Sequence, residues 1–300
     1  MFHGSLVAIV TPMKADGSLD LKSLAGLIDW HIENDTNAIV VLGTTGESPT
    51  INATEREQIV RYTIRHVADR IPVIVGTGAN DTRVAVAMAQ QAMELGADAC
   101  LVVTPYYNKP TQEGLFQHFA AVAEAASIPL ILYNVPSRTG CDLLPATVER
   151  LAKFTNIIGL KEATASIDRM RTILQCCGDS LDLFSGDDAS CMDFMLAGGK
   201  GVISVAANVV PKAMHDLSVA ATEGNREQAK VINAQLQPLY KMLTIESNPI
   251  PVKWAVHEMG LIDVGIRLPL TPLMQEFRQS LNVVLKQLGI LRGIKNEMAN

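Results

Sequence analysis

A lysine ends a run of strand-forming residues, and its position indicates a particular chemistry. The run is Ile-Ile-Gly-Leu-Lys-Glu-Ala at 157–163, and its lysine is Lys161. Burying an ammonium at the end of an apolar strand is costly, and this cost lowers the pKa of the amine. A neutral amine is the nucleophile that condenses with a carbonyl to form a Schiff base. On this stretch alone, a lysine that extends to solvent or pairs with Glu162 is the better interpretation. The rest of the chain makes a Schiff-base lysine the better one.

Eight short β-rich runs, each followed by a turn and a longer amphipathic segment, place this lysine in a repeating architecture. Their hydrophobicity is continuous rather than alternating, which is typical of strands buried on both faces of a parallel sheet. Eight such units predict an α/β fold, a closed (β/α)8 TIM barrel, because eight parallel strands then leave no edge unpaired. The runs span 6–12, 38–43, 72–78, 99–107, 129–136, 157–163, 181–188 and 201–209.

An open doubly wound sheet is the alternative architecture. Its phosphate-binding fingerprint is incomplete, since Asp81 stands where the GxGxxG pattern that begins at Gly76 needs its last glycine. Asp81 instead fits the start of a helix and Gly96 its end, while Thr54 and Glu57 fit a capping box.

The β-rich text stops after about residue 224, and a C-terminal helical extension follows. Residues 225–243, 248–259 and 271–289 look helical and are separated by prolines. We therefore expect a catalytic barrel over 1–223 and a C-terminal helical region over 224–300.

Composition and charge exclude several classes of function. Hydrophobic residues make up 48% of the chain and charged residues 19%, which provides a large core. The net charge of -6, without a basic run, gives no general attraction for nucleic acid or anionic membranes. No stretch approaches about 18 uninterrupted apolar residues, and the apolar run at 6–10 lacks the cationic segment of a signal peptide. Five cysteines without CxxC spacing predict free thiols in a reducing compartment, so we expect a cytoplasmic protein.

Polar side chains gather at the C-terminal ends of the predicted strands, where TIM-barrel chemistry takes place. Taken singly, each also fits a turn, a core position or a solvated loop. Together they offer an amine nucleophile, phenolic acid/base groups, a hydroxyl relay and a guanidinium for a carboxylate. These strand ends are GTTGE at 43–47, TPYYNKP at 104–110, YNVPSRTG at 133–140, Lys161, SGDD at 185–188 and Ile203.

Metal-dependent and Ser-His-Asp chemistry fit the sequence less well. The six histidines are scattered and form no HxH or HExxH pattern. Asp187 and Asp188 are acidic neighbours, but a helix start before Met192 explains them more simply than a cation site. We expect neither a metal nor an organic cofactor.

The motifs GTTGE, YNVPSRTG and GLKEA, in this order, resemble the dihydrodipicolinate synthase / N-acetylneuraminate lyase superfamily over essentially the whole chain. The resemblance implies that Lys161 forms a Schiff base with pyruvate in a class I aldolase-type reaction. In the synthase branch, the resulting enamine attacks aspartate semialdehyde on the diaminopimelate route to lysine. Tyr133 would shuttle protons, and Thr44 would link it to Tyr107 of the neighbouring subunit in a homotetramer built as a dimer of dimers.

The resemblance also implies which residues hold the substrates. Thr45 would bind the pyruvate carboxylate through its backbone N–H, and Gly186 and Ile203 would line the pyruvate pocket. Arg138 would bind the carboxylate of the aldehyde substrate in bidentate fashion.

Two other classes of function compete with the synthase. Sugar-acid lyases of the superfamily share the Schiff base but generally lack an arginine at the position of Arg138, which favours the synthase. A catalytically silent binder would have no reason to retain Lys161, Tyr133 and Thr44 together.

Regulation by lysine is the last expectation that the resemblance carries. Ser48, Asn80 and Tyr106 match positions that bind lysine in feedback-controlled members. The chain departs from those members at three positions, and loss of a carboxylate partner for the effector's ammonium predicts weak or absent inhibition. The departures are Val84, Ala53 and Arg56.

Overall fold

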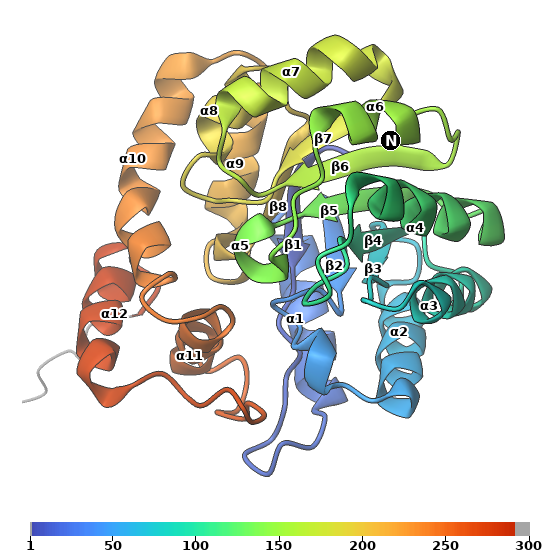
Figure 1. The fold of residues 1–300 in the computed structure, drawn as a ribbon. Coiled ribbons are helices and arrows are strands. Elements are labelled where there is room, and N and C mark those ends of the chain that lie inside the picture. The colour runs from blue at the N-terminus through green and yellow to red at the C-terminus, as the bar shows by residue number, and fades with distance from the viewer. Residues whose placement is uncertain (1, 292–300) are drawn as a thin grey trace, which may run out of the picture.

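The computed structural model describes residues 2–291, in which eight parallel strands form a closed barrel surrounded by helices (Figure 1). Each strand pairs with the next, and β1 pairs with β8 through the register of Leu6 with Ile203. The predicted (β/α)8 barrel is confirmed, and this closing pair rules out an open sheet. The strands are β1 (Gly4–Ala8), β2 (Ala38–Val41), β3 (Val73–Gly76), β4 (Ala99–Val103), β5 (Leu130–Asn134), β6 (Ile157–Glu162), β7 (Asp182–Ser185) and β8 (Gly201–Ser204).

Helices connect consecutive strands and cover the outside of the barrel (Figure 1). Short 3-10 helices follow β2, α7 and β8. The helices around the barrel are α1 (Leu21–Glu33), η1 (Ser48–Thr50), α2 (Ala53–Val67), α3 (Thr82–Leu95), α4 (Gln112–Ala125), α5 (Pro136–Thr139), α6 (Pro145–Leu151), α7 (Ile167–Cys177), η2 (Gly178–Ser180), α8 (Cys191–Leu196), η3 (Ala206–Asn208) and α9 (Pro211–Thr222).

Strand side chains divide between two apolar layers. Leu6, Ile131, Tyr133 and Ile203 belong to one cluster, which fills the barrel interior, whereas alternate residues such as Leu132 pack against the helices. This alternation follows from the two-residue period of a strand. Because both layers are apolar, the strands read as continuous hydrophobic runs in the sequence.

Helix caps account for several boundaries and correct one of the predictions. Asp81 accepts a hydrogen bond from the backbone N–H of Arg83, and Gly96 ends α3 with a φ of 91°. The capping box of α2 is formed by Asn52 and Glu55 rather than by Thr54 and Glu57. The helix starts at Ala53, so the third helical position belongs to Glu55.

Most of the predicted strands are too long at their C-terminal ends. β4 ends at Val103 and β8 at Ser204, whereas the predicted runs continue to residues 107 and 209. The residues beyond these ends form loops and η3 instead. The apolar pattern continues past the sheet because these loops are themselves partly buried over the barrel mouth.

The C-terminal region is helical, as predicted, and lies on one side of the barrel (Figure 1). It comprises α10 (Arg226–Met242), α11 (Ile250–Glu258) and α12 (Gln275–Gln287), and α10 packs along α9. The last helix begins four residues later than predicted, because Pro272 and the turn before it keep 268–274 out of a helix. The predicted region runs to 300, and 292–300 lie outside the described residues. None of the helices between residues 2 and 291 has the length and hydropathy needed to cross a membrane.

Candidate active site

Lys161 is buried at the C-terminal end of β6, and its ammonium faces an aromatic ring. The side chain lies beside Tyr133 in the register between β5 and β6, and Nζ is 4.4 Å from the centre of the Tyr133 ring. Only 5% of the residue is exposed. Burial lowers the pKa of Lys161 to about 8, the charge of Asp188 opposes this shift, and Arg138 adds to it. The amine therefore has the environment of a Schiff-base nucleophile.

Tyr133 links the lysine to the turn that follows β2. Burial raises the pKa of the Tyr133 phenol, while the Arg138 guanidinium and a hydrogen bond from Thr44 act in the opposite direction. Arg138 lies on α5 at the exposed rim, where it donates to the carbonyl of Asn248 at 3.3 Å. The structure thus brings Lys161, Tyr133, Thr44 and Arg138 to one mouth of the barrel.

Gly186 and Ile203 bound the space beside the lysine. A Cβ on Gly186 would lie 2.7 Å from the Cβ of Ala163 and 3.1 Å from the Cε of Lys161. Ile203 is 1% exposed and belongs to the same interior cluster as Tyr133. A side chain at position 186 would therefore occupy the room next to the nucleophile.

Thr45 is buried in the turn after β2, and a residue from the C-terminal region holds it. Its hydroxyl oxygen accepts a hydrogen bond from Nδ2 of Asn248 at 3.0 Å. Asn248 thus contacts both Thr45 and Arg138. Sequence reasoning missed Asn248 because it follows a helix more than 40 residues after the last strand, where no strand-end pattern marks it.

Tyr107 does not reach the mouth within its own chain. Its residue is 89% exposed, and its φ of 77° lies in the left-handed region. The backbone N–H donates to the carbonyl of Thr139 at 3.2 Å, which fixes the loop while the phenol faces outward.

Glu162, next to the lysine, faces the opposite side of the strand and does not pair with it. Its carboxylate accepts from Nε of Arg169 at 3.0 Å and from Nδ2 of Asn134 at 3.1 Å. Arg169 also binds Asp142, through contacts of 2.9 and 3.0 Å. The interpretation of Lys161 as the partner of Glu162 is therefore wrong, and this network anchors the ends of β5 and β6 from behind.

Of the acidic pair after β7, only Asp187 contributes to the predicted helix start, through Ser190 at the beginning of α8. Asp187 accepts from the backbone N–H of Ser190 at 2.9 Å, but Asp188 accepts from Val205 and Ala206 at 3.1 and 2.8 Å. Asp188 therefore caps η3 after β8, and its charge acts on Lys161. No group of three His, Cys, Asp or Glu side chains within residues 2–291 is arranged to hold a metal.

The three residues that match an effector site contact Arg56 and Asn108. Nη1 of the buried Arg56 donates to the hydroxyl of Ser48 at 2.9 Å, and Nη2 donates to the carbonyl of Gly76. Tyr106 is 38% exposed and lies near the Arg56 guanidinium. Asn80 is exposed, and its carbonyl accepts from Asn108.

A buried amine at the mouth of a (β/α)8 barrel, beside a phenol, defines a Schiff-base lyase of the class I aldolase type. Residues 1–288 match the model of the dihydrodipicolinate synthetase family, and the chain belongs to that family.

Known proteins resemble the chain over nearly its full length. The 4-hydroxy-tetrahydrodipicolinate synthase of Coxiella burnetii (strain Dugway 5J108-111) is 61% identical over 97% of this chain and 99% of its own. The enzyme of the same name from Nitrosococcus oceani is 58% identical over 97% of this chain and 100% of its own. A crystal structure of the chloride-inhibited dihydrodipicolinate synthase from Acinetobacter baumannii, complexed with pyruvate, has a TM-score of 0.96 and 52% identity. It covers 97% of this chain and 100% of that one.

Proposed function

We propose that the chain condenses pyruvate with L-aspartate 4-semialdehyde to give 4-hydroxy-tetrahydrodipicolinate, in the diaminopimelate route to lysine. The observation that carries the proposal is the buried Lys161 amine, 4.4 Å from the centre of the Tyr133 ring and next to the space that Gly186 leaves open. The names of the relatives point to the same reaction.

In the proposed reaction, the neutral amine of Lys161 attacks the ketone carbon of pyruvate, and loss of water gives a Schiff base. Loss of a methyl proton converts it to an enamine, whose terminal carbon attacks the aldehyde carbon of the second substrate. The substrate amine then displaces Lys161 by transimination and closes the ring. Tyr133 accepts and returns the protons, and Thr44 connects its phenol to the rest of the relay.

The substrate carboxylates are held at two separate places. The backbone N–H of Thr45 takes the pyruvate carboxylate, with Gly186 and Ile203 lining the pocket. Arg138 takes the carboxylate of the aldehyde substrate at the exposed rim, where a planar guanidinium can bind it through two hydrogen bonds. The aldehyde half of a sugar acid carries no carboxylate, so it would leave the Arg138 guanidinium without a charged partner.

A homotetramer built as a dimer of dimers completes the proposed site. Tyr107 is a large aromatic side chain that is 89% exposed on a fixed loop, which suits a residue that enters a neighbouring subunit's mouth. In this proposal the catalytic barrel extends over 1–223 and the C-terminal helical region over 224–300, and the described part of that region, up to residue 291, lies on one side of the barrel. The site of action is the cytoplasm.

Regulation by lysine is weak or absent in this proposal. The positions of Ser48, Asn80 and Tyr106 would form the effector site, but Val84 supplies no carboxylate for the effector's ammonium. Arg56 is buried beside Ser48 and adds a positive charge there, which would repel that ammonium.

Turnover of pyruvate with aspartate semialdehyde tests the reaction, with a dihydrodipicolinate reductase as the coupling enzyme and oxidation of its nicotinamide cofactor as the signal. Borohydride trapping with pyruvate, followed by mass spectrometry, tests the nucleophile separately. We expect a covalent adduct on Lys161 in the unmodified chain and none in Lys161→Ala. An adduct without turnover would move the substrate assignment to a sugar acid, and absence of an adduct would rule out both enzymes.

A further inference from the structure

The turn that carries Thr44 and Thr45 has a backbone conformation that its residues do not favour. Leu42 and Glu47, at its two ends, are not glycines, yet both have a φ of 57°. Left-handed residues of this kind persist only where the surrounding structure fixes them. Contacts from outside the turn must therefore maintain it.

The strongest such contact is a buried ion pair at Glu47. Its side chain has no exposed surface, and Oε1 accepts from Nζ of Lys253, whose side chain is 5% exposed. Oε2 accepts from the backbone N–H of Arg267 at 3.1 Å. Both oxygens of the carboxylate are thus held by the C-terminal region.

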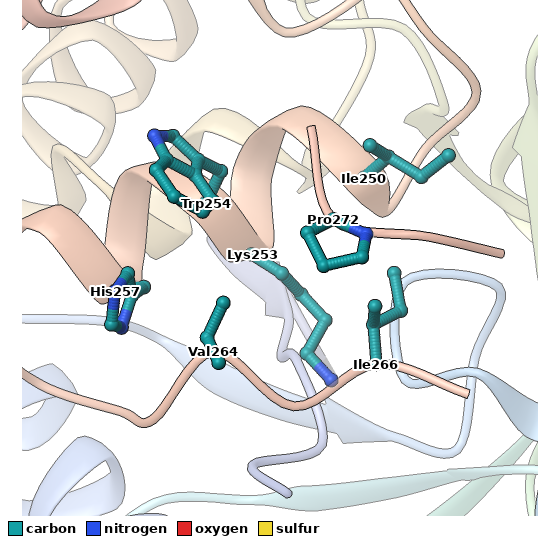
Figure 2. Close-up of a pocket in the computed structure, with 7 residues that line it drawn as sticks. All are labelled: Ile250, Lys253, Trp254, His257, Val264, Ile266 and Pro272. Carbon is teal, nitrogen blue, oxygen red and sulfur yellow. The ribbon is translucent and has the colours of Figure 1, made fainter. Parts of the chain in front are cut away.

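Lys253 extends from α11 across a narrow gap. Figure 2 shows its side chain directed from the helix toward the segment that carries Val264 and Ile266. The cavity beside it, about 10 Å³, is large enough for about one water molecule and too small for a substrate. The ammonium is therefore placed to hold the turn, not to bind a ligand.

Two further contacts hold the same turn and its continuation. Asn248 donates to the hydroxyl of Thr45, and Arg267 binds the carbonyl of Thr50 and the carboxylate of Glu55. A buried ion pair adds little stability compared with well-packed apolar side chains. The contribution of this pair is therefore to select one conformation of the turn.

We infer that Glu47 and Lys253 are positioning residues, which hold the turn so that Thr45 presents its N–H to the pyruvate carboxylate and Thr44 its hydroxyl to Tyr133. This inference rests on the proposed function of that turn. It assigns the C-terminal helical region a part in pyruvate binding, although neither residue touches a substrate.

The test measures the pyruvate concentration that gives half-maximal borohydride trapping in the unmodified chain, in two variants of the pair and in a control variant. Lys253→Met leaves Glu47 buried without a cation, and we expect its half-saturating concentration to rise at least tenfold and its melting temperature to fall. Glu47→Gln/Lys253→Met removes both charges of the pair, so its melting temperature should recover while the half-saturating concentration stays at least tenfold raised. A purely structural pair would recover in both measurements.

Lys230→Met is the matched control, because it makes the same substitution in the C-terminal region but breaks only an exposed ion pair with Glu227 on α10. It should trap pyruvate within twofold of the unmodified chain. In the coupled assay, Lys253→Met should raise the KM for pyruvate. The KM for aspartate semialdehyde should stay within threefold of the unmodified chain, because Arg138, which we propose binds that substrate, lies on α5. Normal pyruvate binding in folded Lys253→Met, or an equal defect in Lys230→Met, would overturn the inference. Failure of the unmodified chain to form any adduct would instead remove the proposed function.

Discussion

At the scale of single residues, the protonation state of Lys161 determines how much neutral amine is available for the first step that we propose. Its pKa is lowered to about 8 by burial, so the neutral amine increases as the pH rises through this value. Asp188 favours the ammonium and Arg138 opposes it. The two charges therefore act on one nucleophile in opposite directions.

We expect the rate of adduct formation with pyruvate to rise with pH and to level off above about 8. Arg138→Met removes a positive charge, so the midpoint should move to higher pH; Asp188→Asn removes a negative charge, so it should move lower. Initial rates of borohydride trapping across the pH range measure both shifts. Movement of both midpoints in the same direction would contradict this assignment of charges.

Gly186 can be tested by adding a single methyl group. In Gly186→Ala the new Cβ would press on Ala163 and on Cε of Lys161, at 2.7 and 3.1 Å. Displacing the amine should lower kcat/KM for pyruvate by about a hundredfold. Gly26→Ala is the control, because its Cβ would have no neighbour within 4 Å, and its kinetics should be unchanged.

The poor fit of lysine to the proposed effector site also depends on single side chains. The ammonium of the effector would meet Val84 and Arg56 instead of a carboxylate, a loss on the order of a few kcal/mol. Steady-state assays should therefore show no lysine inhibition in the submillimolar range. Val84→Glu supplies a carboxylate and should increase inhibition; strong inhibition of the unmodified chain would show that the effector binds in another way.

At the scale of elements, β5 and β6 act together, because Tyr133 and Lys161 lie side by side on one face. The opposite face is held by Asn134, Glu162 and Arg169, which connect both strands to α7. A carboxylate that is 1% exposed depends strongly on its cation.

Arg169→Met should destabilise the fold, since it leaves Glu162 buried without a positive partner. Loss of one member of a buried pair costs about 3 kcal/mol, which should appear as a lower melting temperature. Arg171→Met, on the same helix, breaks only an exposed pair with Asp168 and should melt like the unmodified chain. Equal melting temperatures for the two variants would show that the network is dispensable.

Sequence patterns predict the strands and the buried lysine at the end of β6 better than the contacts that support them. Continuous apolar runs identify the strands, and strand ends identify Lys161, Tyr133 and the 43–47 turn, because these features are local. Asn248 and Lys253 bind Thr45 and Glu47, which lie 203 and 206 residues earlier in the chain, and Arg169 also needs Asp142, 27 residues earlier. Periodicity can show which face of a helix is buried, but not which carboxylate that face will meet. The capping box of α2, at Asn52 and Glu55, lies two residues before the predicted one for a related reason, since two overlapping capping patterns compete there.

At the scale of the whole molecule, the C-terminal region does more than cover one side of the barrel. It contacts the catalytic turn through Asn248, Lys253 and Arg267, all from the segment around α11. Loosening this segment should therefore weaken pyruvate binding before it unfolds the barrel.

The outward-facing Tyr107 has a consequence for mixtures of defective subunits. Lys161→Ala lacks the nucleophile, and Tyr107→Phe lacks the phenol that we propose each subunit lends to its neighbour. In a hybrid dimer of the two, one mouth would combine an intact Lys161 with an intact Tyr107, so activity should reappear after dissociation and reassembly of the mixture. Each variant treated alone is the control, and a mixture that stays as inactive as its parts would place the Tyr107 hydroxyl outside the relay. The working unit of this enzyme would then be a pair of chains, each incomplete without the other.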